Sequence, residues 1–189
     1  MRKKQKYRYS PETKYGKKAV TWFLAIVIFL IAAFKFKNVI IWGILSFIAV
    51  GLKYCRIKNV PQLPIVFEPV LFVATVLTRG YGFEWSLLFL LGPNLISEIV
   101  SGGIQFTLLL SSFKFIAYQL INILLGDVSI IIVGILLPTI DLFVDIVLNV
   151  KIFGQPPIFL MYNVSTIVCH AIYFSIFGEV VVSILRATI

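Results

Sequence analysis

Charged side chains are scarce in this sequence. Of 189 residues, 13% are charged and 60% are hydrophobic, and the mean hydropathy is +1.00. Soluble domains carry about 25% charged residues. The composition therefore excludes an ordinary soluble domain, and the apolar runs are continuous rather than alternating, which excludes a transmembrane β-barrel.

Residues that carry catalysis or bind metals are also few. The chain has one histidine, His170, and two cysteines, Cys55 and Cys169, without a C-x-x-C pair. A single histidine excludes the multi-histidine copper, zinc and di-iron sites of membrane oxidases, unless a partner subunit supplies ligands. Phosphate-binding loops, H-E-x-x-H motifs and nucleophile elbows are missing too. We therefore expect no enzymatic activity, no metal and no cofactor.

What the chain does contain is apolar segments. They predict an all-α fold, a polytopic transmembrane helical bundle with six to seven membrane segments. We expect three parts: a tail over 1–18, a short N-terminal transmembrane hairpin over 19–53, and a helical membrane core over 60–189. Each hairpin arm is short, roughly 24 Å against a core of about 30 Å, so two short crossing helices and an interfacial or re-entrant hairpin both remain open. The segments run over 19–34, 38–52, 65–78, 86–101, 104–125, 126–150 and 158–185.

The positive charge is concentrated near the N-terminus. Eight of the 17 basic residues lie in the first 18 positions, next to the first apolar segment. This pattern predicts a cytoplasmic N-terminal tail lying against anionic lipid headgroups in the cell membrane, rather than a nucleic-acid partner. A second basic cluster, from Lys53 to Lys58, is expected as a cytoplasmic loop containing Cys55.

Two carboxylates stand inside the apolar run over 126–150. Asp141 and Asp145 are one helical turn apart, and Asn149 extends the same face. Ionised carboxylates are costly at membrane depth, so they face the inside of a bundle. Pro138 removes one backbone hydrogen bond and frees the carbonyl of Gly134, which predicts a kinked or opened helix just before Asp141.

Lys114 lies near the middle of the segment 104–125, and Glu98, Asp141 and Asp145 are its candidate partners. One interpretation is a buried ionic lock that fixes helix packing. The other starts from the excess of carboxylate, because three acids against one lysine leave charge that must be protonated, solvated or bound to a ligand. His170 falls on the polar face of the last segment, where we expect it to be hydrogen-bonded and packed rather than titrating.

The order of short motifs between Pro61 and Gly103 is distinctive. P-x-x-P is followed by an apolar segment, a G-x-G turn at Gly80, a second segment with G-P and Glu98, and then S-G-G. This order resembles a superfamily of small six-helix membrane proteins. It comprises the substrate-binding S components of energy-coupling factor vitamin transporters and the rod-shape-determining protein MreD.

The resemblance implies a helical membrane fold, other membrane subunits as partners, and Glu98 as a functional residue. The chain departs from the S components in one motif, since neither 19–34 nor 38–52 has their A-x-x-x-A pair. It also has one apolar segment more than expected in its N-terminal half.

Two functions follow from these features. In the first, the protein binds or transports a small molecule or ion at a site among the last four segments, lined by Glu98, Lys114, Asp141, Asp145 and His170. In the second, it is a non-catalytic accessory or scaffold subunit of a larger membrane complex. A transport site requires a cavity that touches at least two of the acids, whereas a scaffold requires acids that are fully paired.

Overall fold

In a computed structural model of the chain, the structure describes Trp22 and residues 36–59, 69–102, 106–152, 154 and 159–189. All regular structure in these residues is helical, without a strand, so the expectation of an all-α fold is confirmed. The predicted tail over 1–18 and nearly all of the segment 19–34 lie outside the described residues. The chain divides into two compact units, Met1–Ile40 and Ile41–Ile189, and the features below lie in the second.

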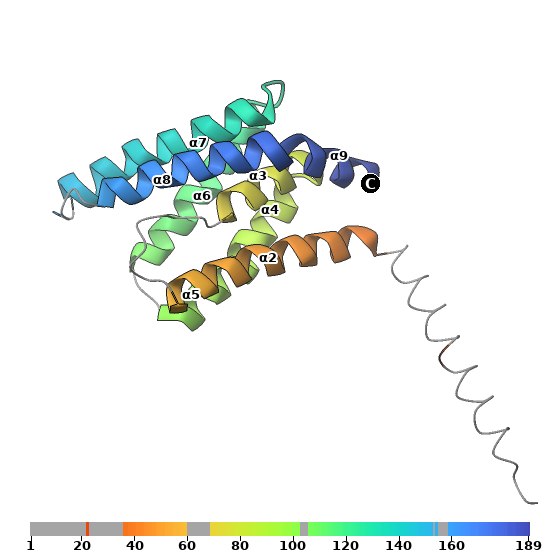
Figure 1. The fold of residues 1–189 in the computed structure, drawn as a ribbon, viewed down its shortest axis with the longest axis horizontal. Helices are drawn as coiled ribbons and strands as arrows, with labels where there is room; N and C mark the ends of the chain where they lie inside the picture. Colours follow the sequence, from red (N-terminus) through yellow and green to blue (C-terminus); the bar gives the residue numbers. More distant parts are fainter. Residues whose placement is uncertain (1–21, 23–35, 60–68, 103–105, 153, 155–158) are drawn as a thin grey trace, which may run out of the picture. The chain divides into compact units, whose positions relative to one another are not determined.

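In the described part of the chain, three π-helical turns lengthen the α-helices. The continuous rod of α8 and α9 is visible in Figure 1. The turn η1 joins α4 to α5, η2 extends α7, and η3 joins α8 to α9. Such turns are rare and recur at functional sites. The elements are α2 (Lys37–Asn59), α3 (Val70–Gly80), α4 (Phe83–Phe89), η1 (Leu90–Asn94), α5 (Leu95–Gly102), α6 (Phe106–Leu124), α7 (Ile130–Asp145), η2 (Ile146–Ile152), α8 (Phe159–Tyr173), η3 (Phe174–Gly178) and α9 (Glu179–Ala187).

Among the residues that the structure describes, four stretches of helix are long and apolar enough to cross a membrane: Lys37–Arg56, Phe83–Val100, Ile130–Ile152 and Val164–Ala187. Two further apolar helices, Val70–Gly80 and Leu110–Leu124, are shorter. Large apolar side chains such as Phe47, Phe113 and Leu124 point outward and are exposed. An exposed apolar surface of this extent suits lipid rather than water.

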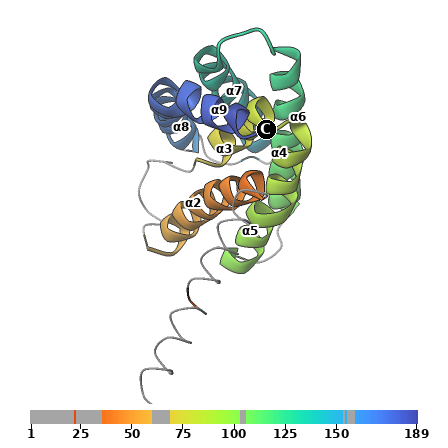
Figure 2. The ribbon, with the colours of Figure 1, turned by 90° about the vertical axis from the view of Figure 1, so that its right-hand side faces the viewer.

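Helix α3 lies at the centre of the bundle. Every residue from Leu71 to Thr78 is buried, and α4, α6, α7 and α9 pack around the helix (Figure 2). The ring of Phe72 meets the ring of Phe174 edge-on, with centroids 5.0 Å apart. The side chains of α3 thus form the middle of the main hydrophobic core.

Helices α7 and α8 run side by side (Figure 1). Gly134 of α7 allows the close approach of η3, which follows α8, because a Cβ at Gly134 would overlap the ring of Phe174 at the start of η3. Pro138 does not open the helix, since α7 continues through it from Ile130 to Asp145. Of the two predicted effects of this proline, the opened helix was wrong, and the kink stays a prediction. Packing of α7 against α8 holds the turns on both sides of the proline, and the irregular turn η2 comes only after Asp145.

The basic cluster from Lys53 to Lys58 is helical rather than a loop. It forms the last turns of α2, which continues to Asn59. No glycine or proline occurs between Leu52 and Asn59, and lysine, arginine and tyrosine are all compatible with a helix. With 23 residues, α2 is about 34 Å long, enough to cross the hydrocarbon core.

Candidate functional site

Lys114 of α6 lies between the two aspartates of α7. Its Nζ atom is 2.6 Å from Oδ1 of Asp141 and 2.8 Å from Oδ1 of Asp145. The three side chains are largely buried, with 13%, 14% and 15% of their surface exposed. Two carboxylates spaced by four residues face the same side of a helix, so one ammonium bridges both. The sequence predicted this contact.

Tyr118 belongs to the same cluster, although sequence analysis did not assign it to the site. Its hydroxyl donates a hydrogen bond to Oδ1 of Asp141 at 2.9 Å. Tyr118 follows Lys114 by four residues, so both side chains leave the same face of α6. Its ring is buried against Leu71, Val133 and Leu137, which fixes the position of the hydroxyl.

The Lys114 cluster sets two carboxylates against one ammonium and one neutral phenol donor. A carboxylate at membrane depth is costly unless it is paired, protonated or bound to a cation. Among the residues that the structure describes, no three His, Cys, Asp or Glu side chains come together to hold a metal ion.

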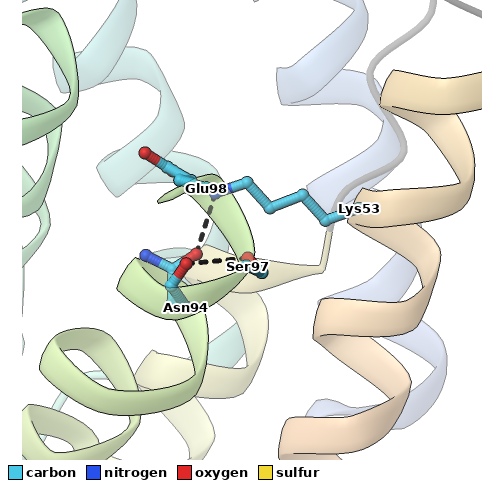
Figure 3. Close-up of polar contacts among 4 residues, drawn as sticks. All are labelled: Lys53, Asn94, Ser97 and Glu98. Carbon is cyan, nitrogen blue, oxygen red and sulfur yellow. Dashed lines mark hydrogen bonds and ion pairs between the residues drawn. The ribbon is translucent and has the colours of Figure 1, made fainter. Parts of the chain in front are cut away.

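Glu98 lies in a different cluster from Lys114, contrary to the predicted pairing. It forms an ion pair with Lys53 of α2, and Lys53 Nζ also donates to Oδ1 of Asn94 at 2.9 Å (Figure 3). The sequence assigned Lys53 to a surface loop, yet only 5% of this residue is exposed. The signal for its burial was its helical spacing from Ser46 and Ala49, which are buried on the same face of α2.

Asn94 and Ser97 complete this second cluster. The hydroxyl of Ser97 donates to the carbonyl of Asn94 at 2.7 Å (Figure 3). Asn94 is the last residue of η1, directly after Pro93, and its side chain is buried. It therefore accepts the Lys53 hydrogen bond away from water, where a charge-assisted bond is strongest.

His170 lies apart from both acidic clusters. It is 2% exposed, and Nδ1 is 2.8 Å from the carbonyl of Thr166. Because a carbonyl only accepts, Nδ1 carries the hydrogen. The imidazole stacks on Phe174 at 30°, and its Nε2 has no hydrogen-bond partner among the described residues. This geometry agrees with the expected packing role and separates His170 from the predicted acidic site.

A third polar network joins α3 to α6. The hydroxyl of Thr78 donates to Gln119 Oε1 at 3.0 Å, and Arg79 Nε donates to Asn122 Oδ1 at 2.7 Å. The guanidinium of Arg79 also donates to the carbonyl of Leu125, at 2.6 Å, and to that of Gly126. Leu125 and Gly126 directly follow the last residue of α6, and the carbonyl of Leu125 also accepts from the amide of Val128 at 3.0 Å. Arg79 therefore caps this end of α6. No pattern in the sequence indicated this role.

A cavity of about 420 Å³ opens between α2 and the rod formed by η1 and α5. Residues between Trp42 and Tyr54 form one wall, and residues between Pro93 and Val100 form the other. We call this cavity the α2–α5 groove. Its lining is apolar and includes none of Glu98, Lys114, Asp141 or Asp145. It therefore does not provide the acid-lined cavity that a transport site requires.

Comparison with known proteins finds no family model, no curated protein and no solved structure that matches this chain. The resemblance to the superfamily of S components and MreD rests on the motif order between Pro61 and Gly103. The function is therefore argued from side-chain geometry.

Proposed function

We propose that this chain is a multi-pass protein of the cell membrane that binds or transports a monovalent cation or a small cationic molecule. The site is the Lys114 cluster, formed by Lys114, Asp141, Asp145 and Tyr118. The observation that carries the proposal is the sharing of one ammonium by two carboxylates, at 2.6 Å and 2.8 Å. Charges at membrane depth mark ion and substrate pathways more often than they serve packing alone.

The proposed mechanism is exchange at the carboxylates. In the resting protein the ammonium of Lys114 occupies the position between Asp141 and Asp145. An entering cation takes that position, and the ammonium of Lys114 swings away with its proton. Tyr118 holds Asp141 in place during the exchange through its hydrogen bond. The turn η2 begins directly after Asp145, and an irregular turn there provides a place where the helix can move.

The proposal extends to the architecture that the resemblance implies. The proposed protein has six to seven membrane segments and a cytoplasmic N-terminal tail. In this respect it resembles an S component. The sequence contains no nucleotide-binding motif, so transport by this chain draws on partner subunits or on an ion gradient.

Ligand-dependent thermal stability tests the site directly. The purified protein in detergent is heated with sodium, potassium, lithium and a series of primary amines, alongside Asp141→Asn and Asp145→Asn. We expect one ligand to raise the Tm of the wild type saturably, and either substitution to abolish the rise. Glu84→Gln is the matched control, because Glu84 is an exposed carboxylate on α4, outside both clusters. A rise that survives both aspartate substitutions, or no rise with any ligand, overturns the proposal.

A specific observation also favours a second function, that of an accessory or scaffold subunit. Glu98 is paired with Lys53, both aspartates contact Lys114, and the α2–α5 groove touches none of these acids. In this case the ion pairs only fix the helix packing. A charge-free variant, Lys114→Met with Asp141→Asn and Asp145→Asn, then unfolds at the wild-type temperature or above, because a buried ion pair is replaceable by neutral groups. Such a result with no bound ligand favours the scaffold.

A further inference from the structure

Buried polar side chains continue along α6 beyond the Lys114 cluster. Lys114, Tyr118 and Asn122 are four residues apart, so they share one face of the helix. Tyr118 and Asn122 are buried, and Asn122 Nδ2 donates to the carbonyl of Thr75 on α3 at 3.2 Å. Eight residues of helix rise about 12 Å, so this line of polar groups runs from the Lys114 cluster to the end of α6 that Arg79 caps.

Four buried polar residues form the contact between α3 and α6 at this end. We call them the α3–α6 seam: Thr75, Thr78, Gln119 and Asn122. Gln119 directly follows Tyr118 in the chain. Thr75 lies one helical turn beyond Leu71, which belongs to the same core cluster as Tyr118. The seam therefore begins next to Tyr118, whose hydroxyl binds Asp141 in the Lys114 cluster.

Two polar atoms of the seam have no hydrogen-bond partner among the described residues, Nε2 of Gln119 and Oγ1 of Thr75. The orientation of the Gln119 amide follows from Arg79. Because Arg79 Nε donates to Oδ1 of Asn122, the Nδ2 atom of Asn122 faces Gln119 and donates to its Oε1 at 3.3 Å. Nε2 of Gln119 therefore points away from Asn122. Water commonly satisfies buried polar groups of this kind, so the seam is suited to hold water.

Arg79 lies between the seam and the surface. Its side chain is half-buried, and it contacts the buried Asn122 as well as the carbonyl of the exposed Gly126. A positive charge at the end of a polar path repels cations, which are the proposed ligands of the Lys114 cluster. In this position Arg79 closes the seam to them.

A second position is available to the guanidinium. Asp127 directly follows Gly126, and Glu179 is the first residue of α9; both side chains are exposed and attract Arg79 through space. Inside the seam the guanidinium contacts neutral oxygens, whereas outside it meets carboxylates. Charge-assisted hydrogen bonds to these carboxylates offset the contacts that Arg79 loses when it turns outward.

From these contacts we infer that the α3–α6 seam is a water-bearing route to the Lys114 cluster and that Arg79 is its gate. The route is closed while the guanidinium contacts Asn122, and it is open when the guanidinium turns toward Asp127 and Glu179. The inference assigns an access route to the proposed cation site and rests on that function in this respect. The gate itself is measurable without a bound cation.

Thiol labelling of buried positions tests the gate. Thr75→Cys reports on the seam, and Val76→Cys is the matched control, because Val76 is the next residue of α3, is equally buried and belongs to the hydrophobic core. Each variant is made in a Cys55→Ser/Cys169→Ser background, once with Arg79 retained and once with Arg79→Gln. The purified proteins in detergent are treated with methanethiosulfonate ethylammonium, a small cationic thiol reagent.

We expect slow labelling of both thiols while Arg79 is present. Arg79→Gln is expected to accelerate the labelling of Thr75→Cys by at least about 10-fold, because a buried thiol reacts in proportion to the open population. The same substitution is expected to leave the labelling of Val76→Cys unchanged. If Thr75→Cys fails to fold, Gln119→Cys reports on the same seam in its place.

Three outcomes overturn the inference. Rapid labelling of Thr75→Cys with Arg79 in place shows that the seam has no gate. Unchanged labelling in Arg79→Gln shows that Arg79 does not close it. Equal acceleration at Thr75→Cys and Val76→Cys shows a general loosening of the bundle. If labelling is gated but no cation raises the Tm, the gate stands and the cation site is rejected; a Tm rise without gated labelling keeps the site and rejects the gate.

Discussion

Lys53 and Glu98 form an ion pair inside the bundle although they are 45 residues apart in sequence. One belongs to α2 and the other to α5, and Asn94 accepts a second hydrogen bond from the same ammonium. The contact fixes the rotation of α2 about its own axis relative to α5, because only one face of α2 carries Lys53. In this orientation of α2, its groove-lining residues face those of η1 and α5 across the α2–α5 groove.

Removal of one partner from this pair is expected to destabilise the protein strongly. Lys53→Met leaves Glu98 as an uncompensated charge, and loss of a buried partner costs about 3–5 kcal/mol. The double variant Lys53→Met/Glu98→Leu removes both charges and is expected to recover most of that loss. Denaturant unfolding in mixed micelles measures the free energy, with Lys151→Met as the control at an exposed lysine. If the loss of unfolding free energy in the double variant equals the sum of the losses in the two single variants, the ion pair is contradicted.

Gly134 is expected to tolerate no side chain. Gly134→Ala places a methyl group in the ring of Phe174, and overpacking of this kind costs about 1–3 kcal/mol. Thermal unfolding measures the loss. Gly51→Ala serves as the control, since a Cβ there meets no atom within 4 Å. Phe174→Leu is expected to restore part of the stability in the Gly134→Ala background, and no recovery would show that another contact limits this interface.

Arg79 is expected to control the end of α6. Arg79→Lys keeps the charge but loses the planar group that reaches Asn122, Leu125 and Gly126 together. Each lost hydrogen bond of this kind is worth about 1.5–3 kcal/mol. Hydrogen–deuterium exchange is expected to accelerate at the amides of 125–128, whereas the amides of α8 keep the wild-type rate. Uniform acceleration through the whole chain would instead indicate global destabilisation.

The native Cys55 provides a test of topology. It is exposed and lies in the basic end of α2, which the positive-inside rule assigns to the cytoplasm. In a Cys169→Ser background, a membrane-impermeant maleimide is expected to label Cys55 in inside-out vesicles and not in intact cells. Labelling from the outside alone would reverse the orientation of α2 and move its basic end to the outer leaflet.

The features that the sequence predicted best have a short-range signal. Asp141 and Asp145 share one face of a helix because of their spacing, and hydrocarbon forces that face inward. Lys114 was then the nearest cation on a neighbouring segment, and the structure brings the three together. The turn between α3 and α4 was also marked by its glycines, and Gly82 adopts a φ of 105°, which favours glycine.

The features that the sequence missed depend on contacts between distant segments. From the sequence, Lys53 belongs to a basic surface cluster, and its burial follows only from the continuation of α2 past it. Because Lys53 was not considered as a partner, Glu98 was listed as a candidate partner of Lys114. The turn η1 contains the G-P pair Gly92–Pro93, whereas η2 and η3 follow no sequence pattern, because one extra residue in a turn is accommodated by packing. Arg79 caps a helix that begins 27 positions later in the chain, at Phe106, and no local pattern indicates that partnership.

The central position of α3 has a consequence for the synthesis of the protein. The helix has 11 residues, or about 16 Å, too short to cross a bilayer alone. Much of what surrounds it is made later, including α9, whose Leu185 lies against Gly80. The translocon therefore receives a segment too short to cross the bilayer by itself, and we expect α3 to reach its final depth only after α9 has been synthesised. A nascent chain arrested before α9 leaves α3 without its cover, in a form that cellular proteases recognise.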